Sequence, residues 1–152
     1  MSSCDVLFPD EKLSMQRENY NGNEVRTDGY YYMYYTNSTN QESIIVFFLY
    51  RNGVMLSAGA YGRNDFDIVE EEMLERYESF QRKKIGWGVF IVLGNKLEYE
   101  QWSTSVGGGL PVFKSFYYIE NDTTLRSPYE RIYHFKQFSP KPDSIAANKW
   151  IK

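Results

Sequence analysis

Apolar segments that end at short polar turns make up most of the chain from residue 27 onward. Val, Ile, Tyr, Phe and Thr fill these segments, and such residues favour β-strands. The pattern predicts seven strands and a shorter eighth strand. The seven cover 27–36, 42–51, 54–60, 86–93, 97–104, 111–120 and 131–138, and the short one covers 123–127.

Tight turns join most of the predicted strands. Asn52-Gly53 lies between two apolar runs, and both residues tolerate the positive φ that a two-residue hairpin requires. Gly94-Asn95 and Asn121-Asp122 are the corresponding turns further along. Between Tyr99 and Trp102 the alternation slips by one residue, which predicts a β-bulge. Sequential strands joined by tight turns are antiparallel, so the pattern predicts a meander.

Residues 67–84 form the one segment with a helical pattern. Its apolar residues recur at helical spacing on one side, and its charged residues lie on the other. Glu70–Glu72 near the start and Arg82–Lys84 near the end complement the helix dipole. A solvated helix start explains the three glutamates better than a metal site does. The apolar side must contact another surface, either an end or the wall of the sheet structure.

The predicted fold class is all-β, with the antiparallel meander closed into an about eight-stranded barrel and the helix inserted in it. The strand at 42–51 is apolar on both faces, so one face lines an interior and something covers the other. Closure removes exposed strand edges, and a barrel of this size is either filled by side chains or holds one small ligand. A two-sheet sandwich is the alternative.

Composition and charge narrow the class of protein. The chain has 152 residues, 42% hydrophobic and 18% aromatic, which fits one folded domain and excludes a disordered chain. One cysteine excludes a disulfide scaffold, and a net charge of −3 argues against a nucleic-acid partner. We divide the chain into a leader or tether (1–26), the barrel (27–138) and an extended tail with two prolines (139–152).

Four short motifs resemble those of a known family. They are Gly29-Tyr30-Tyr31, Arg51-Asn52-Gly53, Gly86-Trp87-Gly88-Val89-Phe90 and the stretch from Tyr133 to Pro140. They are similar to motifs in lipocalin-like (calycin) barrels of small bacterial lipoproteins. The resemblance implies a lipocalin-like barrel that binds a small apolar or aromatic ligand without catalysis. It also implies a place in the bacterial cell envelope, as a periplasmic or outer-membrane lipoprotein.

Cys4 is the candidate for modification. It follows Ser2 and Ser3, and small residues precede the cysteine that is lipidated in secreted bacterial proteins. Together with the family resemblance, this predicts a membrane partner through a lipid anchor on Cys4. A free cysteine in an unstructured leader is the alternative.

The candidate ligand site is the aromatic lining of the barrel. If Tyr31 points inward, strand alternation brings a set of apolar side chains toward the interior, although a shift of one residue would reverse the choice. The set comprises Tyr31, Met33, Tyr35, Phe47, Leu49, Phe90, Tyr99, Phe116, Tyr133 and Phe135. These side chains could line a ligand pocket or fill the barrel completely. Outward-facing tyrosines could instead dock a protein partner.

No residue pattern indicates catalysis. His134 is the only histidine, and most zinc or general-base sites need more than one such group. Glu98 and Glu100 lie two apart on one strand face, which predicts a solvent-facing pair. We therefore expect no enzymatic activity, no metal and no cofactor, and the oligomeric state is left open.

Overall fold

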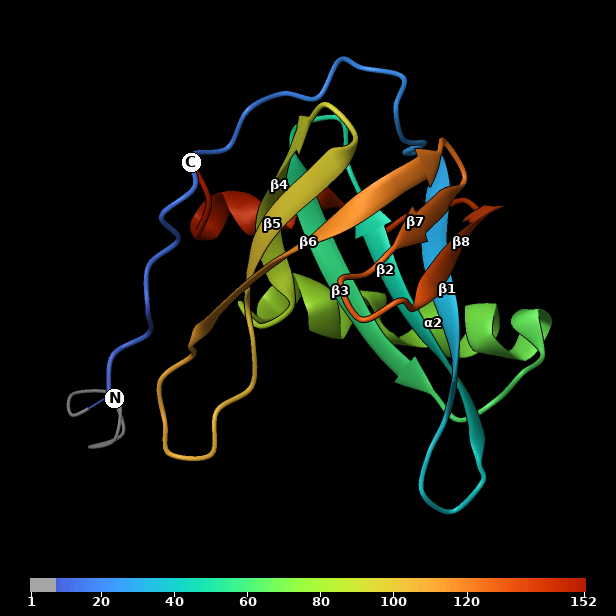
Figure 1. Ribbon diagram of the computed structural model, residues 1–152. Helices are drawn as coiled ribbons and strands as arrows, with labels where there is room; N and C mark the ends of the chain where they lie inside the picture. Colours follow the sequence, from blue (N-terminus) through green and yellow to red (C-terminus); the bar gives the residue numbers. More distant parts are fainter. Residues whose placement is uncertain (1–7) are drawn as a thin grey trace.

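The computed structural model describes residues 8–152 and shows one closed β-barrel (Figure 1). Helix α2 (Phe66–Arg82) connects β3 to β4, and the short 3-10 helix η1 (Ser144–Lys149) follows β8. The strands are β1 (Gly29–Thr36), β2 (Glu42–Leu49), β3 (Val54–Tyr61), β4 (Trp87–Leu93), β5 (Lys96–Trp102), β6 (Val112–Asn121), β7 (Thr124–Arg126) and β8 (Ile132–Gln137).

Each strand pairs antiparallel with the next one along the chain, and β8 returns to pair with β1. Tyr31 on β1 lies opposite Phe47 on β2 and Phe135 on β8. The predicted meander, its closure into an eight-stranded barrel and the helix inserted in it are confirmed. The two-sheet sandwich is excluded.

The predicted bulge in β5 is wrong. The register shifts lie between β2 and β3 and between β6 and β7, whereas β5 pairs without a shift on both sides. Glu100 and Trp102 face outward but are only 2% and 3% exposed. An apolar residue can therefore occupy an outward position here, which breaks the alternation in the sequence without any bulge. Ser14 donates its backbone N–H to Glu100, and Trp102 donates its indole N–H to the Glu11 carbonyl. Glu100 is therefore buried under the N-terminal segment and does not face solvent as expected.

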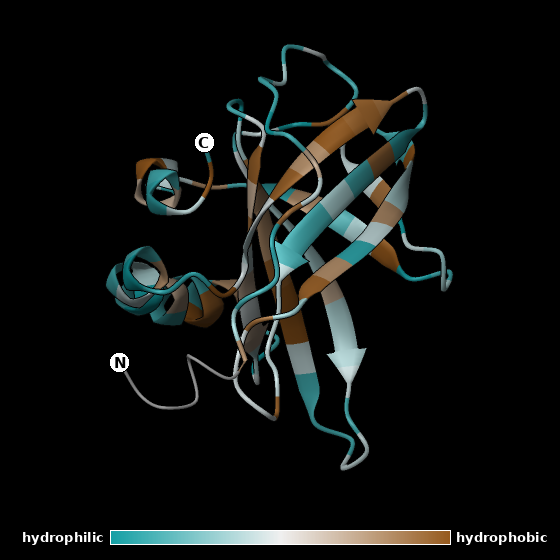
Figure 2. Ribbon diagram, turned by 90° about the vertical axis from the view of Figure 1, so that its left-hand side faces the viewer, coloured by the Kyte–Doolittle hydropathy of each residue, from teal (hydrophilic) through white to brown (hydrophobic). Residues whose placement is uncertain are grey.

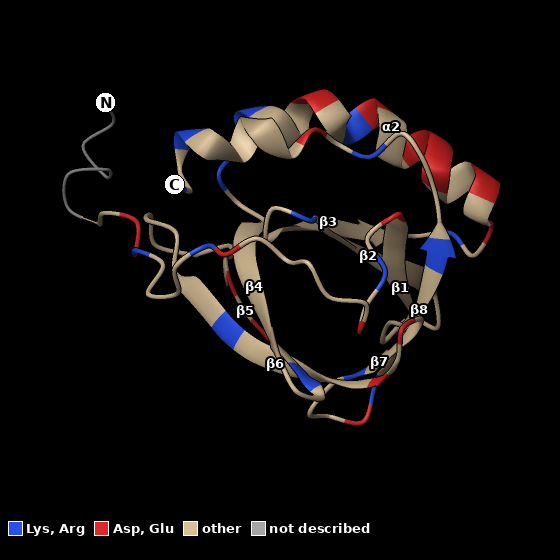
Figure 3. Ribbon diagram, turned by 90° about the horizontal axis from the view of Figure 1, so that it is seen from above, with Lys and Arg blue, Asp and Glu red and all other residues tan. Residues whose placement is uncertain are grey.

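Helix α2 lies along the outside of the barrel wall rather than across an end (Figure 3). The Asp65 carboxylate caps its start by accepting from the Asp67 backbone N–H, and Val69 and Met73 are fully buried beneath it. The helix ends at Arg82 because Lys83 has extended backbone, two residues before the predicted end. None of the helices in the described residues combines the length and the apolar character needed to span a bilayer.

The described part of the predicted leader, residues 8–26, packs against the barrel and is not a free tether. Glu11 donates its backbone N–H to Leu110, and Tyr20 donates its own to Arg51. Val25 is 1% exposed inside the barrel, so this segment contributes to the core. Cys4 lies outside the described residues.

The C-terminal segment is also packed, although an extended tail was predicted. The Tyr50 hydroxyl donates to the Pro142 carbonyl, and Ala147 and Ile151 are buried. The helix η1 and α2 lie on the same side of the barrel (Figure 2). Both cover the outer hydrophobic cluster, which explains why strands such as β2 are apolar on both faces.

Two hydrophobic clusters result from the strand alternation. Tyr30 belongs to the outer cluster between the wall and the helices, and Tyr31 to the inner cluster inside the barrel, and both are fully buried. The aromatic residues therefore have two burial surfaces, as their distribution over both strand faces indicates.

Candidate functional site

Four parallel aromatic rings cross the barrel interior. Tyr31 stacks on Phe47 with ring centroids 5.4 Å apart and an angle of 15° between the planes. Phe47 stacks on Tyr117 at 5.3 Å and 11°, and Tyr117 stacks on Tyr99 at 5.2 Å and 15°. These separations are typical of offset stacking, which is more favourable than a face-to-face sandwich. The stack joins strands β1, β2, β6 and β5 through the middle of the barrel.

Two further rings close the space around this stack. Phe135 meets Tyr31 edge-on at 5.2 Å, and Tyr133 meets Tyr117 edge-on at 5.1 Å. The phenol of Tyr31 also donates to the Asp122 carbonyl near the end of the barrel that residues 20–26 cover. The centre of the barrel is therefore filled by side chains.

Seven of the predicted interior residues belong to the inner cluster or pack against it. They are Tyr31, Phe47, Leu49, Phe90, Tyr99, Tyr133 and Phe135. The structure thus brings these side chains together, although it does not test whether they contact a ligand.

Phe116 does not belong to the inner cluster, and Tyr117 takes the inward position on β6. The register sets Ser115 opposite inward-facing Tyr99, so alternate residues of β6 point inward from there. Phe116 instead lies outside, where the Lys96 ammonium is 4.8 Å from its ring centroid. Three consecutive aromatic residues, 116–118, leave the phase of this strand undetermined in the sequence.

Met33 and Tyr35 lie at the rim rather than in the inner cluster. Met33 is 5% exposed and Tyr35 is 38% exposed, and both line a small hollow between β1 and β8. The prediction that both point inward agrees with the register. Met33 pairs with Ile45, two residues from the inward pair of Tyr31 and Phe47, and residues two apart on a strand share a face. Neither side chain belongs to the inner cluster that holds the stacked rings.

The main hollow of the open end is a pocket of about 540 Å³ between β5, β6 and the β7–β8 turn, which we call the mouth pocket. Its floor includes the last ring of the stack, Tyr99, together with Tyr117 and Tyr133. The other residues that line it are Phe113, Ser115, Phe116, Ser127, Pro128, Tyr129 and Arg131. The mouth pocket is thus an open hollow, lined largely by aromatic side chains, at the end of the filled barrel.

The phenols on the floor of the mouth pocket remain neutral. Burial raises the pKa of the Tyr117 hydroxyl well above its ordinary value, and the neighbouring hydroxyls of Tyr99 and Tyr133 add to this effect. Burial also raises the pKa of Tyr99 and of Tyr133. At neutral pH these groups therefore donate and accept hydrogen bonds but carry no charge.

Among the residues that the structure describes, Arg131 supplies the only charged side chain that lines the mouth pocket. It also borders the smaller rim hollow, where its guanidinium lies 5.9 Å from the Tyr35 ring centroid. Within residues 8–152 this guanidinium takes part in no salt bridge. The positive guanidinium therefore lies at the edge of the mouth pocket, where it could contact a ligand.

The groups that line the mouth pocket are suited to non-covalent contacts. In the part of the chain that the structure describes, no three His, Cys, Asp or Glu side chains gather to hold a metal ion. His134 lines the rim hollow, and its ring centroid is 5.8 Å from that of Tyr32. Aromatic faces, neutral hydroxyls and one guanidinium can hold a ligand by stacking, hydrogen bonding and charge.

Sequence reasoning missed Tyr117, Ser115, Tyr129 and Arg131 as parts of this site. Tyr117 is missed because the prediction places Phe116 inward on the same strand, and the other three lie beside a turn or carry no recognisable motif. The position of Tyr129 and Arg131 beside the break between the predicted strands 123–127 and 131–138 is a weak local signal for them.

Comparisons with protein-family models, with curated proteins and with solved structures gave no match for this chain. Its functional assignment therefore depends on the geometry of the barrel and its mouth.

Proposed function

We propose that this chain is a lipocalin-like binding module that holds a small apolar or aromatic ligand at the mouth of its barrel. The observation that carries the proposal is the hollow of about 540 Å³ whose floor is made of tyrosine rings. Small-molecule sites typically have roughly 300–1,000 Å³ and a mostly apolar lining with a few polar groups. The closed antiparallel meander also supports the lipocalin-like interpretation.

The filled centre limits where the ligand binds. The stacked rings from Tyr31 to Tyr99 leave the mouth pocket as the accessible part of the interior. A flat ligand would extend the stack by one ring and bury its apolar surface on Tyr99 or Tyr133. The phenol hydroxyls and the hydroxyl of Ser115 would fix its orientation.

Filling the pocket tests this proposal. Ser115 points into the mouth pocket from β6, whereas Glu98, on the adjacent strand β5, faces outward opposite Phe116. We expect Ser115→Trp to weaken binding of the neutral fluorescent probe phenylnaphthylamine at least tenfold, and Glu98→Trp to change it less than twofold. Native mass spectrometry of protein from its host should show a bound small molecule that Ser115→Trp loses. Equal probe affinity in both variants would contradict the proposal.

A protein partner at the rim is the second candidate. It is favoured by the exposure of aromatic residues around the open end, with Tyr129 81%, Tyr34 55% and Phe113 47% exposed. A photo-crosslinking residue at position 129 should then give one discrete adduct in the host, while the same residue at exposed Glu75 on α2 should give none. A ligand-binding module without a partner would give no adduct at either position.

We also propose that Cys4 carries a lipid anchor that holds the barrel at the bacterial cell envelope. Support comes from the small residues before Cys4 and from the sequence resemblance to envelope lipoproteins. The gene expressed with its upstream codons should yield a product that partitions into detergent, and Cys4→Ser should abolish the partitioning. A wild-type product that stays in water would rule out the anchor.

A further inference from the structure

A second hollow of about 590 Å³ lies in the side of the barrel, beneath the last turns of α2. It exists because β4 pairs with β3 only from Val54 to Leu56, so the wall opens beyond Leu56. Gly59 has a φ of +88° and no side chain to fill this opening. This wall pocket and the mouth pocket share no lining residue.

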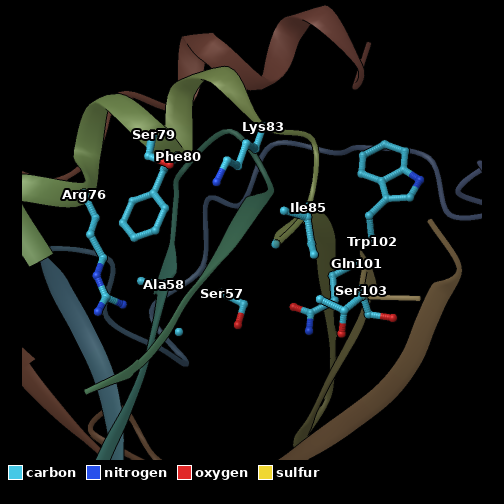
Figure 4. A pocket seen from close by; sticks show the side chains of 13 residues that line it. Ser57, Ala58, Arg76, Ser79, Phe80, Lys83, Ile85, Gln101, Trp102 and Ser103 are labelled. Atoms are coloured by element: carbon cyan, nitrogen blue, oxygen red, sulfur yellow. The ribbon is translucent and has the colours of Figure 1, made fainter. Parts of the chain in front are cut away.

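Cationic side chains enter the wall pocket from the helix. Arg76 on α2 and Lys83, the residue that follows the helix, extend toward the strands (Figure 4). The Arg76 guanidinium lies 4.5 Å from the ring centroid of Tyr61, and one of its nitrogens would be 3.7 Å from a Cβ at Gly59. Within residues 8–152 neither cation forms a salt bridge, and the pocket lining contains no Asp or Glu.

Nearby negative groups are already engaged elsewhere. Glu72, one turn before Arg76, pairs with Arg63 at 3.7 Å. The last carbonyls of α2 also have partners, since Trp87 donates its indole N–H to the Phe80 carbonyl and Lys149 donates to that of Gln81. The positive charge of the pocket is therefore not cancelled by the negative end of the helix.

The strand side of the wall pocket presents an unused acceptor. Gln101 Oε1 is buried and has no hydrogen-bond partner within the described residues. Gln101 and Ser103 lie on the strand side of the pocket, across from the helix, and Phe80 extends into it beside Arg76 (Figure 4). A buried acceptor without a donor is unfavourable, and a ligand N–H would satisfy it.

We propose that the wall pocket binds a small organic anion that carries an aromatic or apolar body and an N–H donor. Its anionic group would contact Arg76 and Lys83, its apolar body would lie on Phe80 and Ile85, and its N–H would donate to Gln101 Oε1. This site is separate from the mouth pocket and does not depend on the function proposed for it.

Anilinonaphthalene sulfonate is a suitable probe because it combines a sulfonate, an N–H and aromatic rings. Phenylnaphthylamine is the same molecule without the sulfonate. Titrations in a Ser115→Trp background, where the mouth pocket is filled, isolate the wall pocket. We expect the sulfonate to bind this variant at least tenfold more tightly than the neutral compound.

Two sets of variants locate the probe. Arg76→Gln with Lys83→Gln should weaken sulfonate binding at least tenfold. Lys12→Gln with Arg82→Gln removes the same charge from exposed residues that do not line the pocket and should change it less than twofold. Gln101→Met should weaken sulfonate binding at least threefold without lowering the free energy of unfolding.

Three results would overturn the proposal. The first is loss of sulfonate binding in Ser115→Trp itself, which would assign the probe to the mouth pocket. The second is an equal loss in the two charge-removal pairs, which would indicate long-range attraction only. The third is equal binding of the charged and the neutral probe.

Discussion

Tyr117 contacts three aromatic rings at once and joins the barrel core to the mouth pocket. It stacks on Phe47 and Tyr99 and meets Tyr133 edge-on, and it is 6% exposed. Its ring and its hydroxyl have separable roles, because the ring fills the interior while the hydroxyl lies with those of Tyr99 and Tyr133.

Substitutions at Tyr117 separate these roles. Tyr117→Leu removes the stacking and leaves a cavity, so we expect the free energy of unfolding to fall by about 3 kcal/mol. Tyr117→Phe keeps the ring and removes one hydrogen-bonding group, so the loss should be about 1 kcal/mol or less. Urea unfolding of both variants measures the difference. Equal losses would mean that the hydroxyl, and not the stack, stabilises the interior.

The sequence does not determine which face of a strand each residue occupies. The prediction assumes that Tyr31 points inward, and this residue does belong to the inner cluster. Phe116, placed inward on the same assumption, does not, because its neighbours on both sides are also aromatic and either phase buries a ring. The pairing of β6 with β5 determines which of its residues point inward. This pairing depends on both strands and cannot be determined from the sequence of β6 alone.

At the scale of elements, the segment 8–26 is held to the barrel through one carboxylate. Glu100 is 2% exposed and accepts from the backbone N–H groups of Ser14 at 2.9 Å and Met15 at 2.7 Å. It also accepts from the Ser14 hydroxyl and pairs with Lys114 at 3.3 Å. Burial by itself raises the pKa of Glu100, but these hydrogen bonds and the Lys114 charge outweigh it and hold the pKa below the ordinary value.

We expect Glu100→Gln to release residues 8–16 from the barrel before the barrel itself unfolds. The ionised carboxylate accepts all three hydrogen bonds, whereas a neutral amide offers one acceptor oxygen and introduces unwanted donors. Hydrogen exchange at the amides of Ser14 and Met15 should quicken at least tenfold. Lys114→Gln, which keeps the carboxylate, serves as the control and should change this exchange less.

The same contact predicts that the attachment of residues 8–16 to the barrel weakens at low pH. Because the folded-state pKa of Glu100 lies below its unfolded value of 4.5, its stabilising contribution is present above pH 4.5. It is lost as the pH falls further through the folded-state pKa. The measured quantity is the protection of the Ser14 and Met15 amides relative to an unstructured chain at the same pH. Wild-type protection that is as high at pH 3 as at pH 7 would contradict this role for the carboxylate. So would equal protection in the wild type and Glu100→Gln at pH 7.

Strands, turns and the helix could be predicted because their signals are local, such as the Asn52-Gly53 turn and the helical spacing of the apolar residues in 67–84. The packing of 8–26 could not, since Ser14 finds its partner 86 residues away. The segment is polar because backbone hydrogen bonds, rather than apolar side chains, attach most of it. A polar sequence of this kind resembles a free tether until the distant acceptor is known.

For the whole molecule, buried ionisable groups dominate the expected response to pH. Burial raises the pKa of many phenols, and that of Tyr61 rises to about 12. The tyrosines with a raised pKa are Tyr20, Tyr30, Tyr31, Tyr32, Tyr50, Tyr61, Tyr77, Tyr99, Tyr117 and Tyr133. Above pH 10 their ionisation is easier in the unfolded chain, so the barrel loses stability there.

Lys141 has the opposite effect over a lower range of pH. Its ammonium lies 4.1 Å from the Tyr50 ring centroid and donates to the carbonyls of Thr27 and Leu49, each at 2.5 Å. Burial lowers its pKa from 10.5 to about 8; this effect outweighs the opposing attraction of Asp28, and the Arg51 charge makes a smaller contribution in the same direction as burial. Between these two values the unfolded chain binds more protons at this position than the folded chain does, so the free energy of unfolding increases with pH.

The two effects together predict a stability maximum near pH 10. The free energy of unfolding, measured with urea at intervals from pH 7 to pH 12, should rise from about pH 8 and then fall as the phenols ionise. Lys141→Met should abolish the rise and leave the fall unchanged, because the methionine cannot titrate while the tyrosines remain. The phenolate absorbance of the ten tyrosines with a raised pKa should appear only as the barrel unfolds, since the buried rings ionise late. A rise in stability that persists in Lys141→Met would assign the rise to another group. Absorbance of the folded chain beyond that of its exposed tyrosines, such as Tyr129, would mean that solvent reaches the stacked rings.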